Sequence, residues 1–212
     1  CISCAHSSFE QKQLKHALDF ATSNRLELEI LLQHYTYDSL KLEAAKFLIR
    51  NMPHCYSYQQ GGEMDSVKRV RTYYSPFGQI DQTYARRWGH YTYRNLPKIY
   101  DAHIITAEYL IDNIDRAFDN WQKRPWNRSL SFEDFCEYLL PYRIGDEPLE
   151  EWRELYEKKY GYLLDSIYKG SDVVEAANLV SRHLQEPVFI YCEDFELPHI
   201  GPRYLFSHRY GS

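Results

Sequence analysis

The sequence predicts a mainly α-helical fold, an irregular bundle or array of about seven helices that ends in a short β-like tail. Two observations lead to this prediction. Apolar residues recur at helical spacing through most of the chain, and this periodicity is the primary sequence signal of amphipathic helices. After Pro187 the spacing changes to the run VFIY at 188–191, and Pro198, Gly201 and Pro202 follow it.

The first part of the chain predicts three short helices. Ser7 and Glu10 form a capping-box pattern ahead of the first helix. Asn24 is placed to cap the second helix and Asp38 the third, which Pro53 ends. The residues expected on the buried faces of these helices are Leu14, Ala17, Leu18, Ala21, Leu28, Leu31, Leu32, Tyr35, Leu42, Ala45, Leu48, Ile49 and Met52.

Residues 53–102 interrupt this pattern. The Gly61–Gly62 pair and the turn sequence SPFG at 75–78 break any long helix. We expect a long, partly helical excursion that is rich in tyrosine and arginine.

Helical spacing returns over residues 103–123, and Ser131 is placed to cap a short helix over 132–140. The face expected to be buried in the first of these helices carries Ile104, Ala107, Leu110, Ile111, Ile114 and Phe118.

Pro148 favours the start of a long helix that reaches about residue 168. Ser171 or Asp172 then caps a last helix that ends near residue 185.

These patterns divide the chain into three parts. A flexible leader is expected over 1–8, a helical domain over 9–186 that contains the 53–102 excursion, and a transition segment over 187–212.

Length and composition indicate a globular chain. It has 212 residues, of which 26% are charged and 44% hydrophobic, and a chain of this size buries roughly 70% of its unfolded surface without metal or disulfide support. No apolar run approaches the ~18 residues of a membrane helix. The net charge of -5 argues against a nucleic-acid partner. The nine histidines include no His-x-x-x-His pair, so we expect no metal and no other cofactor.

Five cysteines are present. Cys1 leads the sequence, as a lipidated cysteine leads a mature bacterial lipoprotein, so Cys1 is a candidate lipidation site and any membrane attachment would be through that anchor. The alternatives are that Cys4 is the modified residue or that the sequence simply begins at an arbitrary point.

The other cysteines do not resemble nucleophiles. Cys136 is expected in the core, because unpaired cysteine is among the most buried residue types. Cys192 is expected to face the core or a strand edge. Cys55 follows His54 directly, and adjacent side chains diverge too much for a productive thiol–imidazole pair. We therefore expect no catalytic residue in this chain.

The best candidate for ligand recognition is the aromatic and basic stretch 67–94. Arginine and aromatic side chains together can hold anionic sugars or cell-wall peptides. The candidate binding residues are Arg86, Arg87, Trp88, Tyr91 and Tyr93. The alternative interpretation is a tyrosine-rich loop that packs over the helices, with its arginines paired to surface acids.

Three stretches carry a family resemblance: LKLEAAKFLIRNMPHCYSY (40–58), ITAEYLIDNIDRAFDNWQKRPW (105–126) and FEDFCEYLLPYRIGDEPLEEWRELY (132–156). Together they resemble the helical region of bacterial envelope proteins of the transglutaminase-like family. The resemblance implies a location in the cell envelope, periplasmic or at the outer membrane.

Transglutaminase-like enzymes use a papain-like Cys–His–Asp triad, with the cysteine at a helix start in a context that resembles Arg-x-Gly-Ser/Asp-Cys. The run Arg209-Tyr-Gly-Ser212 resembles the approach to that cysteine. The resemblance implies that the nucleophile follows Ser212 and that the histidine and aspartate lie further on. A helix N-terminus suits such a nucleophile because its dipole lowers the pKa of a thiol.

Three functional hypotheses follow. The first is a non-catalytic accessory region of a transglutaminase-like envelope protein, with the downstream thiol domain as its partner. The second is a separate binding module for a cell-wall or other glycan, or for a peptide, that uses residues 67–94. The third is a complete small hydrolase, for which the sequence offers no triad with credible spacing.

Overall fold

The structure, a computed structural model, describes residues 2–59, 96–124, 127, 129–167, 173–184, 190–191, 201–203 and 210–211. Over these residues the mainly α-helical fold is confirmed. The principal elements are α1 (Ile2–Phe20), α2 (Arg25–His34), α3 (Ser39–Asn51), β1 (Tyr56–Tyr58), β2 (Lys98–Tyr100), α6 (Ala107–Lys123), α7 (Phe132–Asp134), a π-helix (Phe135–Leu139), α8 (Trp152–Ser166), α9 (Val173–Leu184), β3 (Ile190–Tyr191) and β4 (Tyr210–Gly211).

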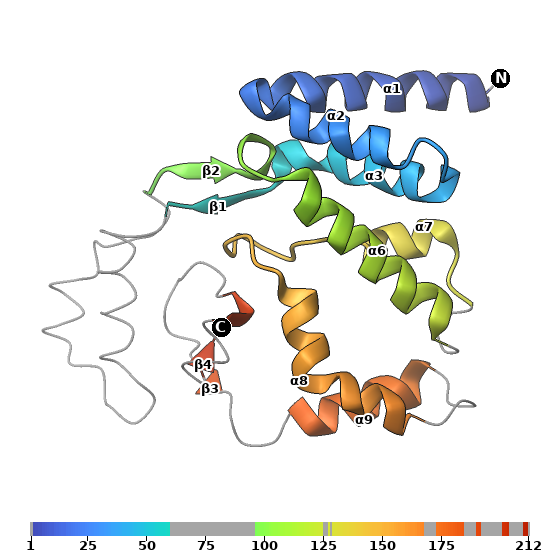
Figure 1. The fold of residues 1–212 in the computed structure, drawn as a ribbon, viewed down its shortest axis with the longest axis vertical. Coiled ribbons are helices and arrows are strands. Elements are labelled where there is room, and N and C mark those ends of the chain that lie inside the picture. Colours follow the sequence, from blue (N-terminus) through green and yellow to red (C-terminus); the bar gives the residue numbers. More distant parts are fainter. Residues whose placement is uncertain are drawn as a thin grey trace, which may run out of the picture.

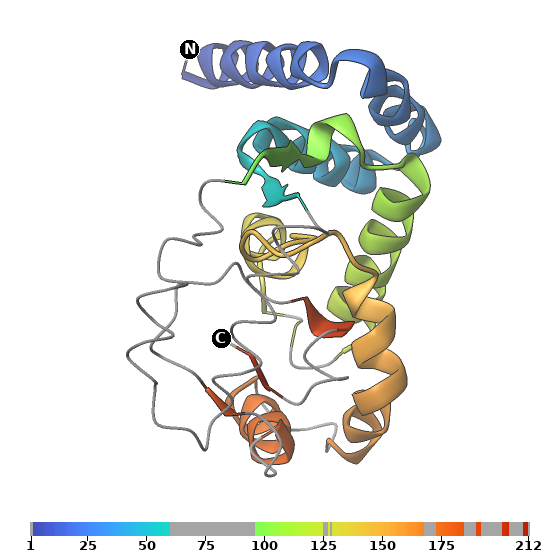
Figure 2. The same cartoon turned by 90° about the vertical axis from the view of Figure 1, so that its left-hand side faces the viewer.

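The helices form an irregular stack. Helices α1, α2 and α3 lie together at one end of the molecule, and α8 and α9 lie at the other (Figures 1 and 2). Helix α6 packs against both α2 and α3 and leads from the first group toward the second. One apolar core joins α1, α2, α3, α6 and the π-helix. Its fully buried large members are Leu28, Leu31, Ile49, Met52, Ile105, Leu110, Ile114, Phe135 and Leu140.

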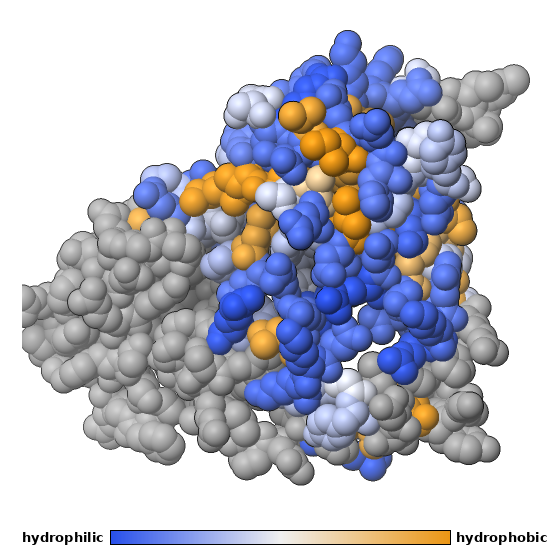
Figure 3. Space-filling model, in the orientation of Figure 1, coloured by the Kyte–Doolittle hydropathy of each residue, from blue (hydrophilic) through white to orange (hydrophobic). Residues whose placement is uncertain are grey.

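The surface is mostly polar on the face shown in Figure 3, where hydrophobic residues gather over α2 and the region in which β2 leads into α6. Among the described residues, no helix is both long enough and apolar enough to cross a membrane.

Three helix starts are held by side-chain caps. The Asp38 carboxylate accepts a hydrogen bond from the Lys41 N–H at 3.1 Å, and the Ser131 hydroxyl accepts one from the Asp134 N–H at 3.0 Å. Both caps were predicted. Thr106 caps α6 in the same way and was not predicted. Each such cap stabilises a helix by about 1 kcal/mol.

Two predicted helix starts are wrong. Helix α1 begins at Ile2, so Ser7 does not cap it. Helix α8 begins at Trp152 rather than at Pro148. The residues before Trp152 form a loop instead of a helix. In this loop the Glu147 carboxylate accepts hydrogen bonds from the backbone N–H groups of Ile144 and Gly145.

Asn24 lies at the start of α2, as predicted, but its side chain makes no cap. It donates instead to the carbonyl oxygens of Ala102 and Ile105, at 3.1 and 2.8 Å. These bonds tie α2 to the short 3-10 turn Asp101–His103 that precedes α6. The helix predicted over 103–123 therefore begins only at Ala107. Ile104 was predicted to be buried but is exposed, and Ile105 is buried in its place.

The segment 53–102 carries an unexpected pair of strands. β1 and β2 are antiparallel, with Tyr56 opposite Tyr100 and Tyr58 opposite Lys98. These strands were not predicted. The partly helical excursion expected over 53–102 stays a prediction, because residues 60–95 lie outside the described part of the chain. In the predicted β-like tail, β3 pairs in parallel with β4.

The helix over 132–140 changes register after α7. The Leu140 N–H donates to the Phe135 carbonyl oxygen, five residues earlier, at 2.9 Å. This π turn places Phe135 and Cys136 in the core and leaves Glu137 exposed. Helices with such turns are rare, and they are found frequently at functional sites.

Candidate functional site: a pocket beside Cys55

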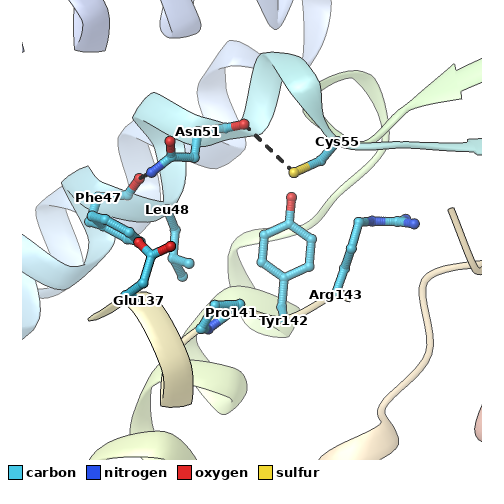
Figure 4. A pocket seen from close by; sticks show the side chains of 8 residues that line it. All are labelled: Phe47, Leu48, Asn51, Cys55, Glu137, Pro141, Tyr142 and Arg143. Carbon is cyan, nitrogen blue, oxygen red and sulfur yellow. Dashed lines mark hydrogen bonds between the residues drawn. The ribbon is translucent and has the colours of Figure 1, made fainter. Parts of the chain in front are cut away.

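A pocket of about 230 Å³ lies between α3 and the segment that follows the π-helix (Figure 4). It is lined by Phe47, Leu48, Asn51, Cys55, Glu137, Pro141, Tyr142 and Arg143. Helix α3 contributes the first three of these side chains, and the turn after it contributes the thiol. The π-helix contributes Glu137 at its exposed side.

Tyr142 is the most deeply buried polar group of the pocket. The residue is 4% exposed, and its hydroxyl lies beside the Cys55 thiol without a hydrogen bond of good geometry to any described residue. The hydroxyl points toward the Cys55 sulfur (Figure 4). Burial raises the pKa of Tyr142 well above its usual value, and the negative charge of Asp101 and the nearby thiol raise it further. The phenol therefore stays protonated and can donate a hydrogen bond.

Arg143 is held by a buried ion pair. Its Nε lies 2.6 Å from Asp101 Oδ2 and its Nη2 lies 2.8 Å from Asp101 Oδ1. Its Nη1 donates to the carbonyl oxygens of Tyr56, Gly145 and Glu147. Burial alone would lower the pKa of Arg143, but the charge and hydrogen bonds of Asp101 outweigh burial and raise it. The guanidinium is thus permanently charged, and it already donates hydrogen bonds to Asp101 and to three backbone carbonyl oxygens.

Asp101 is completely buried, in the 3-10 turn before α6. Burial raises the pKa of this carboxyl group, and the positive charge of Arg143 offsets part of that effect. A carboxylate at this depth requires its ionic partner, because an unpaired buried charge is very costly.

Cys55 is half-buried, and its sulfur lies 3.6 Å from the carbonyl oxygen of Asn51. Burial raises the pKa of the Cys55 thiol, and the Tyr142 hydroxyl and the Arg143 guanidinium offset this only in part. The eight lining residues include no histidine, and His54 is exposed. Since the thiolate is the nucleophilic form, this environment disfavours nucleophilic chemistry at Cys55.

Cys136 occupies a core position, which confirms the prediction for this residue. Burial raises the pKa of its thiol to about 11, and the charge of Glu133 adds to the effect. At neutral pH the thiol is protonated and enclosed.

Several predicted site residues lie outside the described part of the chain: Cys1, Arg86, Arg87, Trp88, Tyr91, Tyr93 and Cys192. Their roles stay predictions. The same holds for the alternative in which the 67–94 stretch is a loop packed over the helices.

The pocket and the ion pair beside it were not predicted from the sequence. Tyr142 and Arg143 stand between Pro141 and Gly145, in a stretch interpreted only as a helix stop. The available signal was a tyrosine and an arginine in a short loop between two helices, because both side chains have an apolar part that can be buried.

Comparisons with family models, with curated proteins and with solved structures found no match to this chain. Within the described ranges, no group of three or more histidine, cysteine, aspartate or glutamate side chains could hold a metal ion.

Proposed function

We propose that the chain is a non-catalytic helical accessory region of a transglutaminase-like cell-envelope protein, and that it positions a thiol domain or the substrate of that domain. The observation that carries the proposal is the environment of the Cys55 and Cys136 thiols. The surroundings of Cys55 and Cys136 both raise the thiol pKa, whereas a thiol nucleophile requires surroundings that lower it.

The placement of the resembling stretches supports the same proposal. They contain nearly all of α3, the whole of α6 and the segment from α7 to the first third of α8. Helix α3 packs on α6, and α6 packs on the π-helix. The stretches that carry the resemblance therefore form one continuous core, as a self-supporting platform would require.

In this proposal the platform gives a fixed surface to a thiol domain joined to it in the same polypeptide. Lipidation at Cys1 would be the anchor that holds the protein at the envelope. The buried contacts among α2, α3 and α6 are suited to a rigid support, because a close-packed core has low compressibility.

The experiment compares the chain with the full product of its gene, which this proposal expects to be longer. Both are assayed for hydrolysis and for transamidation of glutamine-containing peptides, with and without iodoacetamide. We expect iodoacetamide-sensitive activity from the longer protein alone. Thiol-dependent activity in the 212-residue chain would contradict the proposal. A coding sequence without a cysteine, a histidine and an aspartate after Ser212 would contradict its transglutaminase-like part.

The second hypothesis, a glycan- or peptide-binding module, remains a proposal that is tested separately. Its test is pull-down with peptidoglycan and binding to a glycan array, using the Arg86→Ala/Trp88→Ala double variant. We expect binding by the unmodified chain and loss in the variant if the module exists. Equal binding by both proteins would remove residues 67–94 from consideration.

A further inference from the structure

We propose that the carboxylates of Glu150 and Glu151 form a latch that holds residues 201–203 on the helical body, the stack that runs from α1 to α8, and that these residues leave the body when the latch is broken. The latch depends only on contacts within this chain. Its role, to set the path of the chain beyond residue 203, rests on the accessory function proposed above.

The helical body fixes the acceptor side of the latch. The Glu150 carbonyl oxygen accepts a hydrogen bond from the Tyr109 hydroxyl of α6 at 2.8 Å. The same oxygen accepts a second one from the Trp152 N–H, at the start of α8, also at 2.8 Å. Two bonds to one carbonyl group hold the backbone of residue 150 in place. A side chain that projects from a fixed backbone loses less conformational freedom when it binds.

Residues 201–203 fit closely around the Glu150 carboxylate. They form the short red ribbon beside the start of α8 (Figure 2). The Arg203 N–H donates to Glu150 Oε2 at 2.9 Å. Gly201 is buried, and a Cβ atom placed there would lie 2.4 and 2.8 Å from the two carboxylate oxygens. The carboxylate therefore occupies space that a glycine leaves open, as glycine does where two groups approach closely.

The charges on the two sides of the latch are complementary. The Arg203 guanidinium lies 3.6 Å from a carboxylate oxygen of Glu151. A further acid, Glu154, is within reach of its charge: Lys158 lowers the pKa of Glu154, and the positive charges of Arg116 and Arg203 add to this effect. The side chains of Arg203 and Glu151 are 64% and 57% exposed. Salt screens an ion pair that is this exposed, so the latch is expected to weaken at high ionic strength.

The surroundings of residues 201–203 allow them to move without disrupting the core. Their hydrogen bond to Glu150 is exposed to solvent, and segments attached through exposed polar contacts open at a lower free energy than core helices do. The strands that flank them in the sequence, β3 and β4, pair with each other. That pairing involves neither Glu150 nor Glu151, so it can persist when the latch opens.

Hydrogen exchange at the Arg203 N–H of the intact chain tests the latch. It is followed by NMR in a sample labelled with nitrogen-15 arginine, and we expect slower exchange than in the urea-unfolded chain. Glu150→Asp keeps the charge but shortens the side chain, so the carboxylate no longer reaches residue 203, and exchange is expected to be about tenfold faster. Glu150→Gln keeps the length and one acceptor oxygen, so a smaller rise of about threefold is expected, because a charged acceptor makes the stronger bond.

Two references make the comparison specific. Glu157→Gln removes an acid of α8 that pairs with Arg116 instead, and exchange at Arg203 is expected to stay unchanged in this variant. The Arg116 N–H of α6, observed in the same spectra, is expected to keep its exchange rate in every variant, which shows that the fold is intact. In 0.5 M sodium chloride we expect exchange at Arg203 to rise about twofold, through screening of the Glu151 pair.

Brief digestion with trypsin, analysed by mass spectrometry, reports whether residues 201–203 leave the body. Cleavage after Arg203 is expected to accelerate in Glu150→Asp together with hydrogen exchange. The latch is overturned if Arg203 exchanges as fast in the unmodified chain as in urea, or equally fast in the unmodified and Glu150→Asp chains. Faster exchange without faster cleavage would overturn the departure of residues 201–203. None of these results depends on a thiol domain, so the latch and the accessory function can fail independently.

Discussion

The guanidinium of Arg143 holds the carboxylate of Asp101 through two hydrogen bonds of 2.6 and 2.8 Å, across a sequence separation of 42 residues. The Asp101 side chain is 0% exposed and that of Arg143 is 6% exposed. This pair joins the turn before α6 to the loop before α8. It also fixes Tyr142, the neighbour of Arg143, with its hydroxyl directed at Cys55.

Replacement of Arg143 with methionine is expected to lower the free energy of unfolding by about 3–5 kcal/mol, because it leaves a buried carboxylate without a partner. Urea denaturation followed by circular dichroism measures the change. Arg116→Met is the control: Arg116 pairs with Asp112 and Glu157 at the surface, where a salt bridge contributes about 1 kcal/mol or less. Similar losses in the two variants would contradict the importance of the buried pair.

Tyr142→Phe is expected to raise the free energy of unfolding by about 1 kcal/mol, because a buried hydroxyl without a hydrogen bond of good geometry costs about that much. The control is Tyr109→Phe. The Tyr109 hydroxyl donates to the Glu150 carbonyl oxygen at 2.8 Å, so its removal is expected to destabilise the chain by about 1 kcal/mol. Thermal and urea unfolding of both variants check the opposite signs. Destabilisation by Tyr142→Phe would show that the hydroxyl already has a partner.

Gly201→Ala is expected to destabilise the contact between residues 201–203 and the segment before α8. A Cβ atom at Gly201 would lie 2.4 Å from a carboxylate oxygen of Glu150. That carboxylate also accepts a hydrogen bond from the Arg203 N–H at 2.9 Å, so moving it aside sacrifices the bond. We expect the contact to be weakened by about 1 kcal/mol of free energy.

Gly161→Ala is the matched control for that change. Gly161 lies inside α8, and the atom nearest to an added Cβ is 3.9 Å away. Alanine is favoured over glycine in a helix interior by about 0.5–1 kcal/mol, so this variant is expected to gain stability. Protection of the Arg203 N–H from hydrogen exchange reports the local effect, and unchanged protection in Gly201→Ala would contradict the predicted displacement of Glu150.

The alkylation of Cys55 and Cys136 by iodoacetamide is expected to differ in its dependence on pH. The pKa of Cys136 is raised to about 11. The neutral thiol therefore persists below that pH in the folded chain, and its labelling should increase only as the pH rises toward 11. Cys55 is half-buried, and its raised pKa should make it slower than a small exposed thiol at neutral pH.

Mass spectrometry of the digested protein measures each site separately, with the urea-unfolded chain as the reference. If Cys136 reacted at neutral pH as fast in the folded chain as in urea, this would contradict the buried position of its thiol. A Cys55 that reacted faster than in urea would contradict both its raised pKa and the proposed absence of thiol chemistry.

The sequence by itself determined the features that depend on neighbours within a few positions. The caps at Asp38 and Ser131 and the core position of Cys136 were predicted, because capping and helical periodicity are set by residues three or four apart. The apolar faces of α2 and α3 followed for the same reason.

Only the tertiary structure decided which polar side chains meet across the fold. The Asn24 side chain could cap its own helix or bind the segment before α6. In the structure it donates to two carbonyl oxygens of that segment, 78 and 81 residues away. The pairing of Asp101 with Arg143, the alignment of β1 with β2 and the pocket at Tyr142 likewise require segments far apart in the chain to be brought together. The spacing of residues along the chain does not predict such contacts. They form when helices and strands pack together and each buried polar group finds a partner.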